Sequence, residues 1–183
     1  MIRLILIGNS MGVKIEINPV EGIRKFPAFP LVLAAVGGEE HNVITLGLVH
    51  VFSFRPTIIG VGIAPYRYSH ELFHCSSDFT INIPTKDLVE EAIFCGTSSG
   101  RDVDKFLESG LTVKKGEKVD SPVITECPVV FECIKKDAIE IGDHTWFFGE
   151  VVHAEVDEEF DREKLLMYWG GDFRTVGDVI RRI

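Results

Sequence analysis

Short apolar and β-branched segments recur along most of the chain. They cover residues 31–36, 43–51, 57–63, 79–83, 129–134 and 145–156. Gly, Pro, Asn and Asp residues stand between them, which is typical of strands joined by turns. Within residues 79–83, polar Thr80 and Asn82 alternate with apolar side chains, the pattern of a half-buried strand. The pattern therefore predicts a mainly β protein.

Helices are expected at four places among these strands. Ser69 is positioned to cap a helix that runs to about Cys75, and Thr85 to cap another that runs to about Cys95. A third helix is expected over residues 101–108 and a late one over residues 161–168. Many short strands interrupted by a few helices predict a closed β-barrel with helical insertions.

The composition fits one folded domain that spans residues 1–183. A chain of this length buries a sizeable core, and its 45% hydrophobic and 26% charged residues are ordinary for a globular protein. The net charge of -9 argues against a nucleic-acid surface. No apolar run approaches the roughly 20 residues that cross a bilayer. We therefore expect neither a nucleic-acid partner nor a membrane anchor.

The cysteines show no C-x-x-C spacing; they are Cys75, Cys95, Cys127 and Cys133. This spacing disfavours a zinc ribbon or a thioredoxin-type centre, while a disulfide between Cys127 and Cys133 stays open. Four cysteines are too few for a disulfide scaffold in a domain of this size. The reducing cytoplasm is therefore the expected location.

Both ends of the chain are expected to lie outside the barrel core of about residues 27–156. Met11 offers an alternative start, which would make residues 1–10 an N-terminal extension. Residues 155–162 are rich in charge and predict an exposed link to a C-terminal tail of about residues 157–183. The tail is either a simple surface helix or a segment that packs across a partner subunit.

One stretch combines several groups that bind anions: Ser98-Ser99-Gly100-Arg101-Asp102-Val103-Asp104-Lys105-Phe106. A Gly/Ser turn at a helix start exposes free backbone N–H groups, and the helix dipole favours an anion there. In helical register Arg101 and Lys105 share one face, where they add a forked donor and a point charge. Arg67 and Ser69, at another helix start, offer a second set of donors. These residues predict a phosphate site; the alternative is a capped surface helix.

Further segments accompany this stretch in a fixed order. They are Phe29-Pro30-Leu31-Val32-Leu33-Ala34-Ala35-Val36, Asn42-Val43-Ile44-Thr45, Ser53-Phe54-Arg55-Pro56, Tyr66-Arg67-Tyr68-Ser69, Phe79-Thr80-Ile81-Asn82-Ile83, Phe131-Glu132-Cys133 and Gly142-Asp143-His144-Thr145-Trp146. With Ser-Gly-Arg-Asp-x-Asp-Lys-Phe and Gly-Asp-His as its most specific parts, the sequence resembles the flavin reductase-like family, which includes flavoredoxins and archaeal ferric reductases. The resemblance covers about residues 27–156, with a weaker match at residues 168–171. It implies an FMN-binding split barrel, FMN as cofactor, and a homodimer with the flavin near the subunit interface.

The resemblance also implies roles for individual residues. The FMN phosphate would be held by Arg67, Ser69, Ser98, Ser99, Arg101 and Lys105. Residues 42–48 would line the flavin ring, with contacts from Asn42, Thr45, Leu46 and Gly47. Asn82 would approach the cofactor from its strand. His144 would face the flavin and nicotinamide region, where it binds the reductant or steers a proton.

The reaction follows from the same resemblance. No G-x-G-x-x-G follows a predicted strand, so a separate Rossmann nicotinamide site is not expected. The nicotinamide would lie directly on the exposed flavin face. The leading hypothesis is an NAD(P)H-dependent FMN oxidoreductase that passes electrons to free flavin, a ferric chelate or a redox protein. The alternative is an FMN electron carrier that does not react with nicotinamide.

A short motif favours a different chemistry. His70-Glu71-Leu72-Phe73-His74 matches H-E-x-x-H, in which two histidines on one helix face bind zinc and the glutamate acts as general base. Glu90 or Glu91 would be a third ligand. The downstream H-x-x-G-x-x-H continuation is missing. A zinc metallohydrolase therefore ranks below both flavin hypotheses, and no metal is expected.

Overall fold

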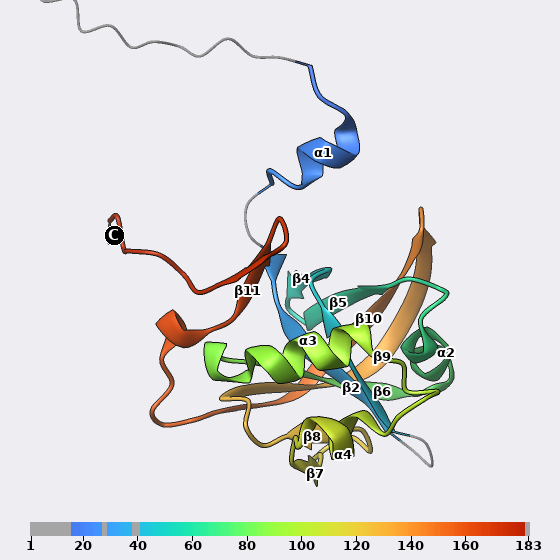
Figure 1. Ribbon diagram of the computed structural model, residues 1–183. Coiled ribbons are helices and arrows are strands. Elements are labelled where there is room, and N and C mark those ends of the chain that lie inside the picture. Colours follow the sequence, from blue (N-terminus) through green and yellow to red (C-terminus); the bar gives the residue numbers. More distant parts are fainter. Residues whose placement is uncertain (1–15, 27–28, 38–40, 182–183) are drawn as a thin grey trace, which may run out of the picture.

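The computed structural model describes residues 16–26, 29–37 and 41–181, and its centre is a curved antiparallel sheet (Figure 1). Seven of the described strands pair in the order β3-β2-β6-β9-β10-β5-β4. Their bounds are β2 (Val32–Val36), β3 (Asn42–Leu46), β4 (Val49–Phe54), β5 (Thr57–Ile63), β6 (Asp78–Ile83), β9 (Val129–Ile141) and β10 (His144–Val156). Beside the turn after β3, the Gly62 N–H of β5 donates to the Leu48 carbonyl at 2.8 Å. This bond joins β5 to the turn that links β3 to β4.

β2 is buried along its whole length because it carries a core on each side. Val32, Ala34 and Val36 belong to the cluster inside the barrel. Leu33 and Ala35 belong to a second cluster, which packs against α3 (Val89–Thr97) and α4 (Lys105–Ser109). Successive side chains of a strand point to opposite faces. An uninterrupted apolar run is therefore what a strand between two cores requires.

Three of the described helices pack around the same end of the sheet. Figure 1 shows α3 lying across the sheet, with α4 below it and α2 (Tyr68–Cys75) to one side. A further helix, α1 (Pro19–Ile23), lies apart from the barrel. The helices expected after Ser69 and Thr85 are present. However, Arg67 is the N-cap residue of α2, and a 3-10 turn (Lys86–Leu88) precedes α3.

The helix predicted over residues 101–108 is wrong at its start. α4 begins at Lys105 because Asp104 caps it, with Oδ1 accepting from the N–H groups of Phe106 at 3.0 Å and Leu107 at 3.1 Å. Arg101 lies in the turn before this cap. Arg101 and Lys105 therefore do not share a helix face, contrary to the prediction.

Two strand predictions change in extent. The segment 43–51 divides into β3 and β4 at the turn formed by Gly47 and Leu48. The segment 129–134 continues to Ile141, because β9 pairs with β10 along nearly its whole length. Gly142, with a φ of 63°, supplies the left-handed backbone that the connecting turn requires.

The helix predicted over residues 161–168 is wrong beyond a single 3-10 turn (Arg162–Lys164). The chain then becomes extended, and β1 (Phe29–Pro30), β11 (Met167–Trp169) and β12 (Asp172–Arg174) form a small sheet in the order β1-β11-β12. Leu166 gives the reason, since its side chain is buried in the cluster beneath α3. Its N–H donates to the Pro84 carbonyl at 3.0 Å.

Other expectations concern smaller features. β7 (Val113–Lys115) and β8 (Pro122–Ile124) form a separate antiparallel pair. All four cysteines are free thiols, so the disulfide left open between Cys127 and Cys133 does not form.

No helix in the described part of the chain is long and apolar enough to cross a membrane. The expected extension at residues 1–10 and the alternative start at Met11 lie outside the described residues.

Candidate functional site

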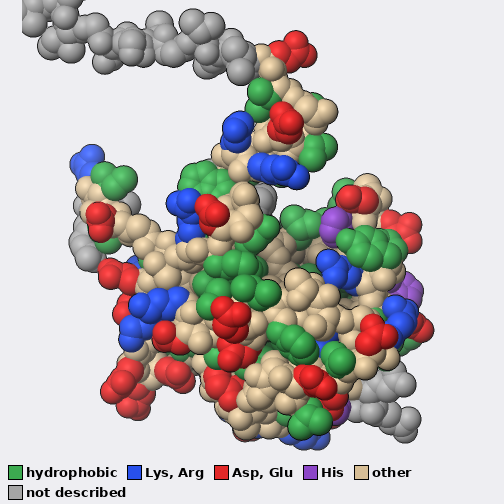
Figure 2. All heavy atoms as spheres, in the orientation of Figure 1, with side chains coloured by type: hydrophobic (Ala, Val, Ile, Leu, Met, Phe, Trp, Pro, Cys, Tyr) green, Lys and Arg blue, Asp and Glu red, His purple; other side chains and the backbone are tan. Residues whose placement is uncertain are grey.

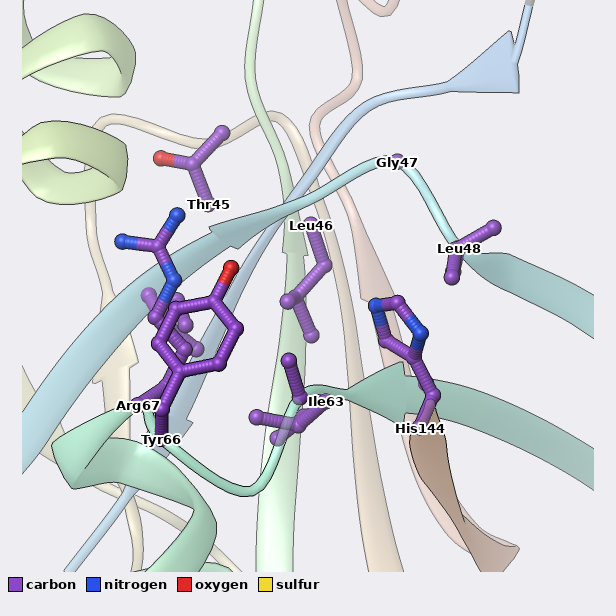
Figure 3. Close-up of a pocket in the computed structure, with 11 residues that line it drawn as sticks. Thr45, Leu46, Gly47, Leu48, Ile63, Tyr66, Arg67 and His144 are labelled. Carbon is purple, nitrogen blue, oxygen red and sulfur yellow. The ribbon is translucent and has the colours of Figure 1, made fainter. Parts of the chain in front are cut away.

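A cavity of about 170 Å³ opens where β3, β5 and the start of β10 come together (Figure 3). The described residues that line it are Ile44, Thr45, Leu46, Gly47, Leu48, Gly62, Ile63, Ala64, Tyr66, Arg67 and His144. We call it the ring cavity. Three of the predicted flavin-ring contacts, Thr45, Leu46 and Gly47, are thus brought together with His144. Gly62 packs closely against this turn, because an added Cβ would lie 3.1 Å from the Leu48 Cβ.

Thr45 contributes by holding a helix rather than by facing the centre of the ring cavity. Its Oγ1 donates to the Ala92 carbonyl of α3 at 2.5 Å, and Figure 3 shows its side chain directed away from Leu46 and His144. Gly96 of the same helix lies so close that an added Cβ would be 3.2 Å from the Thr45 Cβ. Thr45 therefore fixes the distance between β3 and α3.

A second cavity of about 140 Å³ adjoins the first, and we call it the phosphate cavity. It is lined by Ile44, Tyr66, Arg67, Tyr68, Ser69, Thr97, Ser98, Ser99, Gly100 and Lys105. Ile44, Tyr66 and Arg67 line both cavities. The structure thus joins the two donor sets that the sequence singled out, which lie about thirty residues apart in the chain.

Of the two helix starts that the sequence offered for a phosphate, only the one at Arg67 and Ser69 lies at the phosphate cavity. Ser98 is the C-cap of α3, and the Ser-Gly turn leads into a non-helical stretch before α4. The helix that begins at this cavity is α2, whose first residues Tyr68 and Ser69 both line it. The partial positive charge of a helix N-terminus therefore comes from α2.

Asn42 and Gly100 form the wall behind the first turn of α2. The Asn42 side chain is buried and donates from Nδ2 to Ser69 Oγ at 2.8 Å. Gly100 packs so tightly here that a Cβ would lie 2.6 Å from Asn42 Oδ1. Asn42 therefore acts on the phosphate cavity through Ser69 and lines neither cavity itself.

Arg67 stands between the two cavities. One guanidinium nitrogen donates to the Gly96 carbonyl of α3 at 3.2 Å, and the guanidinium carbon lies 5.3 Å from the centre of the Tyr66 ring. Arg67 also lines a third, mostly apolar cavity of about 440 Å³, which includes Tyr168 and Phe173 of the C-terminal hairpin. The sequence did not predict this contribution of the tail beyond a weak match at residues 168–171.

Lys105 and Arg101 occupy different surroundings. Lys105 is only 4% exposed, and its Nζ donates to the carbonyls of Val43 at 2.9 Å and Cys95 at 2.8 Å. Arg101 is exposed, pairs with Glu71 at 3.1 Å and lies over the Tyr68 ring. It borders a neighbouring cavity and not the phosphate cavity. Of these two predicted cations, only Lys105 lines the phosphate cavity with the serines.

Asn82 does not reach the cavities. Its side chain is fully buried, donates to the Leu33 carbonyl at 3.0 Å and accepts from the Ile124 N–H at 2.9 Å. These bonds tie β6 to β2 and β8. Asn82 was predicted to approach a cofactor. In the structure its side chain instead links strands in the core.

His144 begins β10 and lies at the edge of the ring cavity. Its Nδ1 lies 2.7 Å from Asp143 Oδ1, and this contact lowers the pKa of the Asp143 carboxyl. In Figure 3 the imidazole points across the cavity toward Leu48 and the turn at Gly47. Its position fits a group that meets a ligand at the cavity mouth.

The H-E-x-x-H residues are engaged in other contacts. His70 Nε2 lies 2.8 Å from Thr145 Oγ1, and burial, with His74 nearby, lowers the pKa of His70. Glu71 pairs with Arg101. Within the described residues, the one group of three metal-ligating side chains consists of Glu132, His153 and Glu155, and it includes none of the motif's residues. In the part of the chain that the structure describes, no third ligand joins these histidines to form a zinc site.

Comparison with known proteins shows which family this chain resembles. A family model described as "Flavin reductase like domain" matches residues 23–177. An uncharacterized protein of Archaeoglobus fulgidus is 36% identical over 128 residues, which cover 70% of this chain and 72% of that protein. The NADH:riboflavin 5'-phosphate oxidoreductase of Streptomyces pristinaespiralis is 25% identical over 149 residues, which cover 81% and 80%. The crystal structure of flavoredoxin from Methanosarcina acetivorans matches with a TM-score of 0.84 at 27% identity, covering 93% of this chain and 95% of that one.

The fold and the matches together define a mainly β, split-barrel protein of a flavin-binding class. The chain belongs to the flavin reductase-like family, because the family model spans most of its length. The family and the fold class predicted from the sequence are therefore confirmed.

Proposed function

We propose that this protein is an FMN-dependent oxidoreductase that accepts reducing equivalents from NAD(P)H. The observation that carries the proposal is the junction of the ring cavity and the phosphate cavity at Arg67. One part is walled by apolar side chains and the backbone turn at Gly47, and the other by serines and a buried lysine. This pairing suits a planar ring joined to a phosphate.

The residues present fit FMN on chemical grounds. Ser69, Ser98 and Ser99 offer hydroxyl donors to a phosphate, and Arg67 and Lys105 offer charge-assisted donors. The turn at Gly47 leaves backbone groups accessible to a ring edge. When bound, the flavin supplies the redox chemistry. The chain binds it, orients it and leaves His144 at the cavity mouth to meet the reductant.

The identity of the reductant is part of the proposal. The Streptomyces relative is named as an NADH:riboflavin 5'-phosphate oxidoreductase, and riboflavin 5'-phosphate is FMN. The electrons would pass to free flavin, a ferric chelate or a redox protein. The second candidate, an FMN electron carrier without nicotinamide activity, is favoured by the likeness to a flavoredoxin. The four free thiols fit the reducing cytoplasm as the place of action.

A homodimer belongs to the same proposal. β4 is an edge strand of the large sheet, and its apolar Phe52 and Phe54 are 51% and 83% exposed. Ile139 and Ile141 of β9 are exposed as well. Figure 2 shows further hydrophobic side chains near the centre of the face it presents, among scattered carboxylates. Apolar area of this kind and an open sheet edge favour association with a second copy, which would cover both.

Anaerobic mixing of the FMN-loaded protein with NADH or NADPH tests the proposal. Rapid bleaching of the flavin absorbance near its visible maximum is expected with at least one of the two nucleotides. A protein that binds FMN but is not bleached by either nucleotide would support the electron carrier instead. Failure to bind any flavin would overturn both.

A further inference from the structure

Three side chains that can bind a metal meet on the long β9–β10 pair, outside both the ring cavity and the phosphate cavity. One ligand atom each of Glu132, His153 and Glu155 lies within 4.8 Å of the other two. None of these residues lines either of the two cavities. We call the three residues the β9–β10 cluster. The proposed flavin chemistry gives this cluster no part to play.

A β-bulge brings the histidine of the cluster opposite its buried glutamate. The register of β10 against β9 shifts by one residue here, so His153 rather than Val152 pairs with Glu132. Bulges re-aim side chains in this way. Glu155 follows two residues after His153, and alternate residues of a strand share a face. The bulge therefore gathers one imidazole and two carboxylates on one side of the sheet.

Glu132 is a buried carboxylate with no cationic side chain as its partner in the described part of the chain. The residue is only 1% exposed, and no ion pair among the described residues includes it. Its Oε1 accepts from the Glu117 N–H at 2.9 Å and its Oε2 from the Lys118 N–H at 2.7 Å. Both oxygens accept, as in an ionised carboxylate, and each keeps a second lone pair. Buried charges are normally paired or coordinate a metal. Glu132 therefore points to a cation independently of the grouping itself.

The spacing of His153 and Glu155 suits a tetrahedral ion. His153 Nε2 lies 3.3 Å from Glu155 Oε1, which is long for a charge-assisted hydrogen bond. Ligand atoms at about 2.0–2.2 Å from a tetrahedral zinc ion are about 3.4 Å apart. The other oxygen of Glu155 accepts from Lys114 Nζ at 2.7 Å. Lys114 and Glu155 both line a cavity of about 390 Å³, which offers a hydrated ion a path to the cluster.

We propose that the β9–β10 cluster binds one divalent transition metal per chain, with zinc as the best match, and that the ion links the segment after β7 to the β9–β10 pair. One imidazole and two carboxylates suit zinc, whereas magnesium and calcium prefer oxygen ligands alone. Two carboxylates also balance the charge of the ion, and a water molecule would complete four ligands. The segment after β7 is linked because the N–H groups of Glu117 and Lys118 are already bonded to Glu132. This site does not depend on flavin binding.

Titration of the full chain with zinc chloride tests the inference, after EDTA treatment and without a polyhistidine tag. We expect one zinc ion per chain with a dissociation constant of about 1 μM or less, and no displacement by millimolar magnesium. Zinc at about 100 times the dissociation constant should raise the melting temperature by about 5–10 °C. Failure to bind zinc in a one-to-one ratio, or equal binding of magnesium, would overturn the inference.

Two variants at the cluster sharpen the test. His153→Ala should weaken zinc binding by at least about tenfold and remove most of the rise in melting temperature. Lys114→Gln should bind zinc about threefold more tightly or better, because it removes an ammonium that repels the ion and competes for Glu155. The side chain of Lys114 is 45% exposed, so this variant should fold even if His153→Ala does not. Weaker zinc binding by Lys114→Gln would contradict the inference.

His74→Ala is the matched control, because it also removes one imidazole. His70 and His74 stack on α2 with ring centres 6.1 Å apart, so they form the rival zinc site on this chain. His74→Ala should keep the zinc affinity of the wild type and its rise in melting temperature. Loss of zinc binding in His74→Ala but not in His153→Ala would place the ion on α2 and overturn the inference.

Discussion

Replacing Gly100 by alanine should distort the wall of the phosphate cavity and weaken FMN binding. A Cβ at this position would lie 2.6 Å from Asn42 Oδ1 and 2.9 Å from Tyr68 Cδ1, closer than real Cβ contacts. Asn42 cannot simply retreat, because it is buried and its Nδ2 is bonded to Ser69 Oγ. Tyr68 is covered by the Arg101 guanidinium, 4.8 Å from the centre of its ring. The added methyl group must therefore displace the first turn of α2.

The magnitude follows from the cost of overpacking. Inserting a methyl group into a well-packed region costs about 1–3 kcal/mol of the free energy of unfolding. If about 1.4 kcal/mol of this appears as distortion of the phosphate cavity, the dissociation constant for FMN rises about tenfold. Riboflavin affinity should change less, since the ring cavity lies beyond Arg67. Urea unfolding and fluorescence titration with both ligands measure these quantities.

Two other glycines supply the controls. Gly177→Ala should change neither stability nor binding, because nothing lies within 4 Å of its added Cβ. Gly110→Ala should lose about 1–2 kcal/mol of stability from its left-handed backbone, with a φ of 74°, but should bind FMN normally. The reasoning is refuted if Gly100→Ala binds FMN as the wild type does, or if Gly110→Ala loses as much affinity.

Three further substitutions are informative. Thr45→Val should lower the free energy of unfolding by about 1 kcal/mol, measured by urea denaturation, because it removes the bond to the Ala92 carbonyl; unchanged stability would contradict the role given to that bond. His144→Ala should slow anaerobic reduction by NAD(P)H more than it weakens FMN binding, since His144 lies at the cavity mouth; an unaltered rate would leave it a turn residue. Arg101→Ala should weaken FMN binding by less than threefold in a fluorescence titration, because its guanidinium pairs with Glu71 outside the phosphate cavity; a tenfold loss would restore it as a phosphate ligand.

The sequence predicted the parts of the site that depend on local pattern. Local pattern was enough to recognise two candidate phosphate-binding segments, Ser98–Ser99 and Arg67–Ser69. In each of them, groups that can bind an anion stand close together in the sequence. Their convergence follows from the fold, which sets the start of α2 against the end of α3. Short apolar, β-branched runs between turn residues likewise located the main strands. The half-buried strand expected at residues 79–83 is wrong, because Thr80 and Asn82 of β6 are fully buried.

The surroundings of single polar residues could not be predicted in this way. Helical spacing placed Lys105 on one face with Arg101, but the cap at Asp104 starts the helix later, and Lys105 Nζ donates to two backbone carbonyls in the interior. Asn82 has the same alternating pattern whether it faces a ligand or the core. Its bonds to the Leu33 carbonyl and the Ile124 N–H, which come from distant segments, hold it in the core. The C-terminal tail forms a hairpin because Leu166 is buried against residues that are distant in the sequence. A contact of this kind cannot be predicted from the local sequence pattern.

A crystal structure of the FMN complex would test the central claim most directly. The account predicts the phosphate between Ser69 and the Ser98–Ser99 turn, with at least one oxygen at about 2.7–3.2 Å from a donor of this set, and the ring beside Gly47 and His144. A phosphate bound instead in the neighbouring cavity of His41 and Arg101, or a flavin that leaves the ring cavity empty, would contradict it.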